Sequence, residues 1–385
     1  MSHEPHEWSL DTKAIHSGEP EPVLGAVSMP VFQSSTYIYE GESDYNSVRY
    51  IRLNNTPNQI VLGEKLAALE GGAAGTVSAS GMAAISSALL TAVGEGEHLL
   101  IQENLYGGTF HFVAHHFAKM GRSFSTFAPD RPAEWAKLVT PKTRAIYVES
   151  LSNPMMRAPE FGALTRFAKE RGLMTLIDNT FPSPVNFTPI AHGFDLVLHS
   201  ATKYLNGHTD ITAGAAIGSE EMIHKIIVLQ NHLGGTLDPH ACFLLQRGLK
   251  TLGVRVRQQN ESAMQLAGFL AAHPRVKEVL YPGLPSHPQH GHIKDHFRGF
   301  GGMLSFVYRG TVTELDRGLK AMKLAYYAPS LGGAETLITR PRTTSHAGLP
   351  EAEARRLGIV DELVRVSVGL EDPADLIRDF AQALG

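Results

Sequence analysis

The sequence predicts an α/β protein with a mostly parallel central sheet and a smaller C-terminal α/β domain. Short β-rich segments alternate with helical ones: HLLIQ, RSFSTF, AIYVES, MTLID, DLVLHS and AGAAIG are separated by segments such as FGALTRFAKERG. This alternation is typical of parallel strands covered by helices on both faces. The chain has 385 residues, of which 43% are hydrophobic, which is enough for a sizeable core and a second domain.

The elements divide the chain into three parts. Residues 1–60 are rich in Pro, Ser and Asn with little periodicity, and we expect an extended N-terminal arm that reaches a neighbouring subunit. Residues 61–250 form the predicted large domain, which begins with the helices NQIVLGEKLAALEGG and GMAAISSALLTAV. Residues 251–385 form the predicted small domain, which a long helix ending in FLAAH leads into and which holds the strands GGMLSFVYRG and VRVSVGLE.

Composition excludes several classes of function. The formal net charge is -4, so there is no excess of positive charge for nucleic acid or an anionic membrane, and a small-molecule partner is expected. The single cysteine, Cys242, excludes an internal disulfide framework, and the N-terminus lacks a signal-peptide pattern, so we expect a cytoplasmic protein. The histidine-rich segment HPQHGHIKDH lacks cysteines and resembles a solvated loop, so no metal site is expected.

Four groups that follow predicted strands stand out. Asp178 ends the apolar run MTLID, Lys203 follows the run DLVLHS, residues 80–82 open a helix of small residues, and Tyr106 precedes two glycines. Each has an ordinary explanation by itself: a cap, a lysine reaching solvent, a helix start, a loop aromatic. Since strand ends in such sheets meet at one edge, we expect the four groups to lie together.

Together the four groups match the needs of one cofactor, pyridoxal 5'-phosphate (PLP). This cofactor takes a lysine amine for covalent attachment, a carboxylate beside the ring nitrogen, helix N–H groups and hydroxyls around the phosphate, and often an aromatic ring on its face. Without such a site, the ordinary explanation of each of the four groups would have to hold independently, which is a poor alternative. The sequence therefore predicts a PLP site.

The order of the motifs carries a family resemblance. SGMAAI, LYGGT, ESLSNP, IDNTF, HSATKYLNGHTD, RGLKTL, SLGGAETLI and VRVSVGLE resemble the Cys/Met-metabolism family of PLP enzymes over nearly the whole chain. This family includes cystathionine γ-synthase, the cystathionine β- and γ-lyases, methionine γ-lyase and the homoserine sulfhydrylases. The resemblance implies PLP fold type I, the aspartate-aminotransferase-like architecture, and a homotetramer of two catalytic dimers.

The resemblance also implies roles for single residues. Lys203 would bind the cofactor covalently, Asp178 would pair with the ring nitrogen, and Tyr106 would stack on the ring. The residues implied to hold the phosphate are Gly81, Met82, Ser200 and Thr202 of the same subunit and Tyr50 and Arg52 of the neighbouring one. The residues implied to lie against the cofactor or near it are Thr180 and Glu149, and those implied to meet the substrate carboxylate are Arg365, Ser330 and Asn153, with His346 as a minor candidate.

Elementary chemistry gives these roles a rationale. A carboxylate keeps the ring nitrogen cationic, so that the ring can accept electrons from a broken Cα–H bond. An arginine can hold a substrate carboxylate bidentately and so fix the orientation of that bond. A lysine amine freed by the substrate becomes a local base.

We expect γ-elimination on a γ-substituted L-amino acid, such as cystathionine or a homoserine derivative, releasing 2-oxobutyrate or a homoserine-derived product and ammonia. The alternatives are γ-replacement, as in a cystathionine γ-synthase or an O-acyl-homoserine sulfhydrylase, then cystathionine β-elimination, and a non-catalytic PLP sensor. Three positions depart from relatives: Gly108 stands where methionine γ-lyases have YGCT, Pro329 replaces a glutamate that can receive the distal amino group of cystathionine, and NNTPNQ follows Arg52 where NPT is usual.

Overall fold

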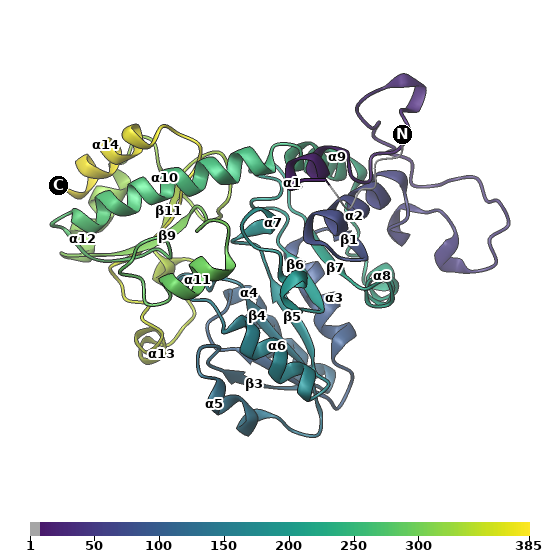
Figure 1. Cartoon of the computed structure of the whole chain (residues 1–385), viewed down its shortest axis with the longest axis horizontal. Coiled ribbons are helices and arrows are strands. Elements are labelled where there is room, and N and C mark those ends of the chain that lie inside the picture. The colour runs from purple at the N-terminus through teal and green to yellow at the C-terminus, as the bar shows by residue number, and fades with distance from the viewer. Residues whose placement is uncertain (1–7) are drawn as a thin grey trace.

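The computed structural model describes residues 8–385, and its larger sheet has seven strands (Figure 1). The strands are β1 (Ala74–Ser78), β2 (His98–Gln102), β3 (Ser123–Phe127), β4 (Thr143–Glu149), β5 (Met174–Asp178), β6 (Leu196–His199) and β7 (Gly214–Gly218). Their order in the sheet is β1-β7-β6-β5-β4-β2-β3. Only β7 runs against the others, since it pairs antiparallel with β1 and β6. The predicted mostly parallel α/β sheet is confirmed.

Helices cover both faces of this sheet, which explains why its strands are apolar without alternation. The helices are α2 (Pro57–Glu70), α3 (Gly81–Ala92), α4 (Gly107–Phe112), α5 (Pro132–Trp135), α6 (Phe161–Glu170), α7 (Ser183–Asn186), α8 (Glu220–Leu233) and α9 (Pro239–Leu249). One buried cluster joins Leu100 of β2 to α2, α6 and α9. A second cluster joins the neighbouring residues Leu99 and Ile101 to α3 and α8.

A second sheet of five strands follows in the chain. Its strands are β8 (Val276–Leu280), β9 (Met303–Tyr308), β10 (Tyr326–Tyr327), β11 (Leu337–Thr339) and β12 (Leu363–Ser367), in the order β10-β11-β12-β9-β8. The helices of this part are α10 (Leu252–Ala272), α11 (His290–His296), α12 (Val312–Lys320), α13 (Glu351–Arg356) and α14 (Pro373–Leu384). The single helix expected before this region is two helices, because α9 ends before α10 begins at Leu252.

Helix α10 runs from the end of α9 to the small sheet, where it packs on β8, β9 and α14 (Figure 1). All strands of the large sheet precede it and all strands of the small sheet follow it. We therefore retain the division at residue 250 as our proposal for the boundary between the two domains, whereas the division proposed at residue 60 falls within α2.

The N-terminal arm is less extended than its composition suggests. Residues 10–16 form helix α1 (Leu10–His16), which packs against α2 and α10. The buried Lys65 of α2 donates to the carbonyls of Ala14 and Ile15, so tertiary contacts supply what the local sequence lacks. Beyond this helix, Leu24, Val27 and other apolar side chains of the arm are exposed.

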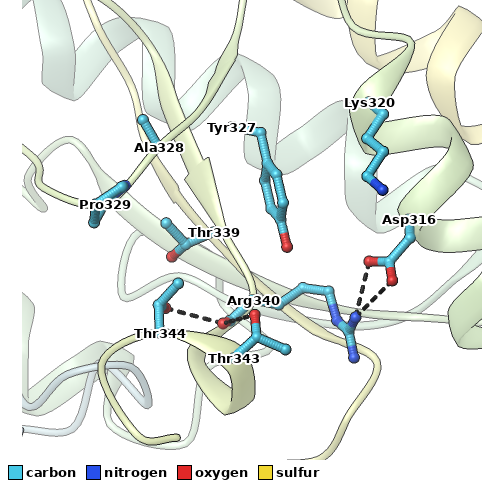
Figure 2. A pocket seen from close by; sticks show the side chains of 9 residues that line it. All are labelled: Asp316, Lys320, Tyr327, Ala328, Pro329, Thr339, Arg340, Thr343 and Thr344. Carbon is cyan, nitrogen blue, oxygen red and sulfur yellow. Dashed lines mark hydrogen bonds and ion pairs between the residues drawn. The ribbon is translucent and has the colours of Figure 1, made fainter.

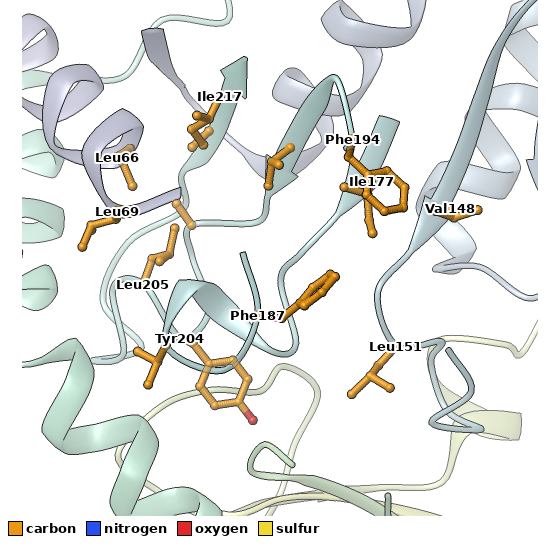
Figure 3. Packing of buried hydrophobic residues seen from close by; sticks show 14 of the residues in the cluster. Leu66, Leu69, Val148, Leu151, Ile177, Phe187, Phe194, Tyr204, Leu205 and Ile217 are labelled. Atoms are coloured by element: carbon orange, nitrogen blue, oxygen red, sulfur yellow. The ribbon is translucent and has the colours of Figure 1, made fainter. Parts of the chain in front are cut away.

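The loop after β6 is anchored deep in the core. Tyr204 and Leu205 are buried and pack into the cluster that holds Leu69 (Figure 3). Arg255 of α10 donates to the carbonyls of Tyr204 at 2.9 Å and Leu205 at 3.3 Å. These contacts fix the backbone that follows Lys203. Lys203 itself lies just beyond the carboxyl end of β6.

Candidate active site

The carboxyl ends of β4, β5 and β6 open into a cavity of about 640 Å³. Of the residues assigned from the sequence, all but three line it: Gly81, Met82, Tyr106, Glu149, Asn153, Asp178, Thr180, Ser200, Thr202, Lys203, Ser330 and Arg365. The small sheet contributes Arg365 from β12, and the segment after β10 contributes Ser330. The two sheets therefore build one site.

Lys203 projects its amine into this cavity. Its Nζ donates to the Ser330 hydroxyl at 2.6 Å. Burial, assisted by the positive charge of Arg365, lowers the pKa of Lys203 from 10.5 to about 8. At pH 7.5 about a quarter of the amines would be neutral, against about one in a thousand at the ordinary pKa. The lysine is thus available as a nucleophile.

Asp178 is a buried carboxylate that lacks a cationic partner. It is 9% exposed, and its Oδ1 accepts from the Thr180 backbone N–H at 2.9 Å and from the Thr180 hydroxyl. Burial raises the pKa of Asp178, although the bonds from Thr180 oppose the shift. Among residues 8–385, no Lys, Arg or His nitrogen lies within 4 Å of its oxygens. A protonated ring nitrogen would supply the missing charge, so this site fits PLP.

Thr180 joins Asp178 to the next strand. Its hydroxyl donates to the Asp178 carboxylate and accepts from the Ser200 backbone N–H at 2.8 Å. The hydroxyl therefore bridges the end of β5 and the start of the loop that carries Lys203. Thr180 positions two of the assigned groups at once.

Glu149 supports the segment that carries Tyr106. It is buried at the end of β4, and its Oε1 accepts from the Tyr106 backbone N–H at 2.6 Å. Burial and the nearby Asp178 raise the pKa of Glu149 well above its usual range. The carboxyl group holds the segment that presents Tyr106.

The Tyr106 ring lies over Gly108, the position at which the sequence differs from methionine γ-lyases, and this contact explains the glycine. A Cβ at residue 108 would lie 2.5 Å from Cε1 of the tyrosine and 3.3 Å from the sulfur of Met82. A side chain there would therefore displace the ring. Glycine at this position permits the close approach.

The start of α3 provides an anion site of the expected kind. Ser80 caps the helix by accepting from the Ala83 N–H at 3.1 Å, and Gly81 and Met82 occupy its first turn. A Cβ on Gly81 would lie 2.8 Å from the Cβ of Ser200, so only glycine fits there. Free N–H groups at a helix start and the adjacent hydroxyl form a suitable cradle for a phosphate.

The hydroxyl of Thr202 is already hydrogen-bonded within the chain, so its assigned contact with the phosphate stays a prediction. Its hydroxyl donates to the carbonyl of Ala213 at 3.1 Å and accepts from the Ala213 N–H at 2.9 Å. The Ser200 hydroxyl, by contrast, has no hydrogen-bond partner within residues 8–385. Ser80, part of the helix start proposed from the sequence as an anion site, also lines the cavity. Thr212 lines it too and was not assigned from the sequence, although it is a small polar residue close to the motif that carries Lys203.

Arg365 is positioned for a carboxylate that residues 8–385 do not supply. It is 6% exposed; Nη1 donates to Asn153 Oδ1 at 3.3 Å and Nη2 to the Ser330 carbonyl at 2.9 Å. Its Nε is buried without a partner in the described part of the chain. Burial lowers the pKa of Arg365 to about 10, which leaves it charged at neutral pH. The unpaired nitrogen fits a substrate carboxylate.

Three other assigned residues lie outside the cavity lining. Arg52 donates to the Asn231 carbonyl and the Tyr45 hydroxyl, each at 2.6 Å, and Tyr50 is partly exposed. Their assigned role on a neighbouring subunit stays a prediction. His346 is buried behind the lining, where burial and Arg365 lower its pKa to about 4, so it is neutral.

Comparison with known proteins agrees with this geometry. The family model described as "Cys/Met metabolism PLP-dependent enzyme" matches residues 11–385. The chain belongs to this family. It is 40% identical over 381 residues to a cystathionine β-lyase of Coxiella burnetii, with 97% of each chain covered. It is 38% identical over 375 residues to a cystathionine γ-lyase of Bacillus subtilis, with 97% of this chain and 98% of the relative covered.

Solved structures agree as well. The chain superimposes with a TM-score of 0.94 on a putative O-acetylhomoserine (thiol)-lyase of Campylobacter jejuni, at 30% identity, covering 98% of this chain and 100% of the other. That structure carries a pyridoxyl-lysine phosphate. MetB of Corynebacterium glutamicum superimposes with a TM-score of 0.93 at 32% identity, with 99% of each chain covered. The family member described here is a PLP-dependent enzyme with fold type I architecture.

Residues 8–385 lack two kinds of feature. None of the helices there combines the length and apolar character needed to cross a membrane. No group of three or more His, Cys, Asp or Glu side chains in that range is arranged to hold a metal ion.

Proposed function

We propose that this enzyme catalyses γ-elimination on a γ-substituted L-amino acid and releases 2-oxobutyrate and ammonia. The observation that carries the proposal is the meeting of Lys203, Asp178 and Arg365 in one cavity. A base, a carboxylate for the ring nitrogen and a carboxylate receptor are the parts that Cα deprotonation of an amino acid needs.

PLP, when bound, supplies an electron sink for the Cα carbanion. Asp178, braced by Thr180, is the carboxylate that would pair with the ring nitrogen and keep it protonated. Gly81, Met82 and Ser200 are suited to hold the phosphate, and Tyr106 to cover the ring. Each of these side chains lines the same cavity.

The substrate is oriented from the small sheet. Arg365 would bind the α-carboxylate through Nε and a terminal nitrogen, with Asn153 and the Ser330 backbone fixing the guanidinium plane. That grip anchors the carboxylate, and the amino group, held by the cofactor when it is bound, would be the second anchor; two anchors on Cα fix the direction of the Cα–H bond.

Lys203 Nζ is the proposed proton carrier. Its pKa of about 8 allows the amine to accept the Cα proton near neutral pH and to release it again. γ-Elimination requires a second proton, from Cβ, before the leaving group departs from Cγ. The same Nζ serves both positions in our proposal because no other buried amine lines the described cavity.

γ-Replacement by the same groups is the second candidate, since it differs only in capture of a nucleophile after the leaving group departs. The relatives include both kinds of enzyme, a cystathionine γ-lyase and cystathionine γ-synthases. Cystathionine β-elimination is the third candidate, supported by the β-lyase relatives.

We further propose that the enzyme is a cytoplasmic homotetramer of two catalytic dimers. The exposed apolar side chains of the arm, among them Leu24, Val27, Ile38 and Tyr39, support a partner subunit that covers them. In such a dimer Tyr50 and Arg52 would complete the partner's phosphate site.

The test is to incubate the PLP-loaded enzyme with L-cystathionine and to identify the keto acid. Release of 2-oxobutyrate supports γ-elimination, whereas pyruvate would move the enzyme to the β-lyases. Product formation only when a thiol or cysteine accompanies a homoserine ester would favour γ-replacement. A visible cofactor band without turnover of any of these amino acids would favour the non-catalytic sensor.

A further inference from the structure

A buried carboxyl group outside the catalytic cavity contacts the ends of two strands at once. Glu70, the last residue of α2, is 1% exposed. Its Oε1 accepts from the side-chain amide of Asn179 at 2.9 Å and pairs with Nε2 of His199 at 2.6 Å. Asn179 directly follows β5, and His199 is the last residue of β6. One oxygen atom therefore joins the two strand ends.

Both partners of Glu70 are sequence neighbours of residues assigned to the cofactor. Asn179 follows Asp178, the carboxylate for the ring nitrogen. His199 precedes Ser200, whose hydroxyl is suited to the phosphate. Asp178 and Ser200 line the cavity, whereas Glu70 and its two partners do not. Glu70 can therefore act on the cofactor only through the residues it holds.

The link from Glu70 to β5 is rigid. Asn179 is fully buried, and its amide nitrogen also donates to the Phe187 carbonyl at 2.9 Å. Its side-chain oxygen accepts from the Ser150 hydroxyl at 2.8 Å. Both polar atoms of the side chain are thus engaged, which leaves the Asn179 backbone little freedom to move relative to Glu70.

Folding stability alone is a poor reason for this arrangement. A carboxylate in the last turn of a helix faces the negative end of the helix dipole. Oε2 of Glu70 and Nδ1 of His199 are both buried without a hydrogen-bond partner in the described part of the chain, and each such atom costs folding energy. Buried pairs of this kind add little net stability. Departures from local rules are expected where function requires them.

We propose that Glu70 is a positioning residue for the cofactor and sets the separation between Asp178 and Ser200. The inference rests on the proposed placement of PLP, with its ring nitrogen at Asp178 and its phosphate at Ser200. Thr180, which lines the cavity, joins the same two residues from the cavity side through its hydroxyl. Glu70 joins their neighbours from outside the cavity. A ligand held at two points gains from both contacts only where the spacing of the points matches its own length.

The test compares PLP with pyridoxal, which has the same ring but lacks the phosphate. The full-length enzyme is stripped of cofactor and titrated with each compound, and the visible cofactor band gives the two dissociation constants. PLP uses both contact points and pyridoxal only the ring contact. Glu70→Ala should therefore weaken PLP binding about tenfold or more and pyridoxal binding at most about twofold.

Conservative variants separate positioning from a loss of folding. Glu70→Gln keeps an oxygen that can accept from both partners, so its PLP affinity should lie within about threefold of the unmodified enzyme. Glu70→Asp draws the carboxylate back by one methylene and should weaken PLP more than pyridoxal, as the alanine variant does. This variant keeps the buried charge and serves in place of Glu70→Ala where that protein does not fold.

Asp379 of α14 offers a matched control in the small sheet. It is 5% exposed, and its carboxylate accepts from the backbone N–H groups of Lys323 at 2.9 Å and Leu324 at 2.8 Å. Asp379→Ala thus removes a comparable buried carboxylate that contacts neither cofactor-binding strand end. It should leave the ratio of the PLP and pyridoxal dissociation constants unchanged.

Equal losses of PLP and pyridoxal affinity in Glu70→Ala, or unchanged affinity for both, would overturn the positioning role. Ser200→Ala separates this inference from the placement of the cofactor, because it removes the phosphate contact itself. If Ser200→Ala weakens PLP alone and Glu70→Ala does not, the placement stands and the role of Glu70 is refuted. If Ser200→Ala leaves PLP affinity unchanged, the phosphate lies elsewhere and the inference is refuted with it. Neither titration involves an amino-acid substrate, so the lyase is tested separately by the keto acid it releases.

Discussion

Replacing Lys203 with Met should stabilise the cofactor-free protein, because burial of the amine costs folding energy. The pKa of Lys203 falls from 10.5 to about 8 in the folded chain. A shift of this size corresponds to at most about 3 kcal/mol of destabilisation at pH values where both states are protonated. Methionine has a similar length and no charge to desolvate, so it should recover most of that energy.

The pH dependence isolates this effect. Between pH 8 and 10.5 the unfolded state binds more protons at Lys203 than the folded state, so the stability of the unmodified protein rises with pH through this window. The advantage of Lys203→Met should therefore be largest below pH 8 and vanish above pH 10.5. Urea unfolding of both cofactor-free proteins at pH 7 and pH 10.5 measures it.

Two results would refute the reasoning. One is a Lys203→Met protein no more stable than the unmodified chain at pH 7, which would mean that the amine is well solvated. The other is an advantage of equal size at both pH values, which would assign it to packing. Lys323→Met, at an exposed lysine, is the control and should show neither effect.

Three further variants test the site. Thr180→Val removes the hydroxyl that donates to Asp178 and accepts from the Ser200 backbone. The pKa of the Asp178 carboxyl should rise, kcat should fall about tenfold or more, and the visible cofactor band should shift with pH. An unchanged band and an unchanged kcat would contradict the bracing role of Thr180. Gly108→Ala should lower kcat at least tenfold because its Cβ displaces the tyrosine ring, whereas Gly268→Ala, with open space around its Cβ, should be silent in the same steady-state assay. Arg365→Lys keeps the positive charge but loses the two-pronged guanidinium, so KM for the amino acid should rise about tenfold or more while the visible cofactor band stays. An unchanged KM would mean that another group binds the substrate carboxylate.

Much of the large sheet could be predicted because its strands carry a strong local signal. The segments HLLIQ and MTLID coincide with β2 and β5, since strands buried on both faces are short uninterrupted apolar runs. The strand AGTVS, β1, was not among the predicted segments. Its pairing with β7 is a tertiary effect.

The histidine-rich segment shows the opposite error. HPQHGHIKDH resembles a solvated loop, yet residues 290–296 form helix α11. His292 stacks on Phe161, His296 packs against the same ring at a tilt, and Ile293 is fully buried. Packing against an aromatic cluster from a distant part of the chain overrides weak local propensity, and no local pattern reports such contacts.

The site itself was easier to predict than its surroundings. Asp178, Lys203 and Tyr106 follow strands, so the topology alone brings them to one edge of the sheet. The cavity bounded by α12, β10 and the segment after β11 (Figure 2) could not be predicted, because these segments meet only through the packing of the small sheet. The engaged hydroxyl of Thr202 likewise depends on a partner, Ala213, that only the folded chain supplies.

The most direct test of the account is borohydride reduction of the PLP-loaded enzyme followed by peptide mapping by mass spectrometry. The account predicts a single phosphopyridoxyl group on the peptide that contains Lys203, and its loss, together with the visible cofactor band, in Lys203→Ala. A phosphopyridoxyl group on another lysine, or full turnover by Lys203→Ala, would contradict it.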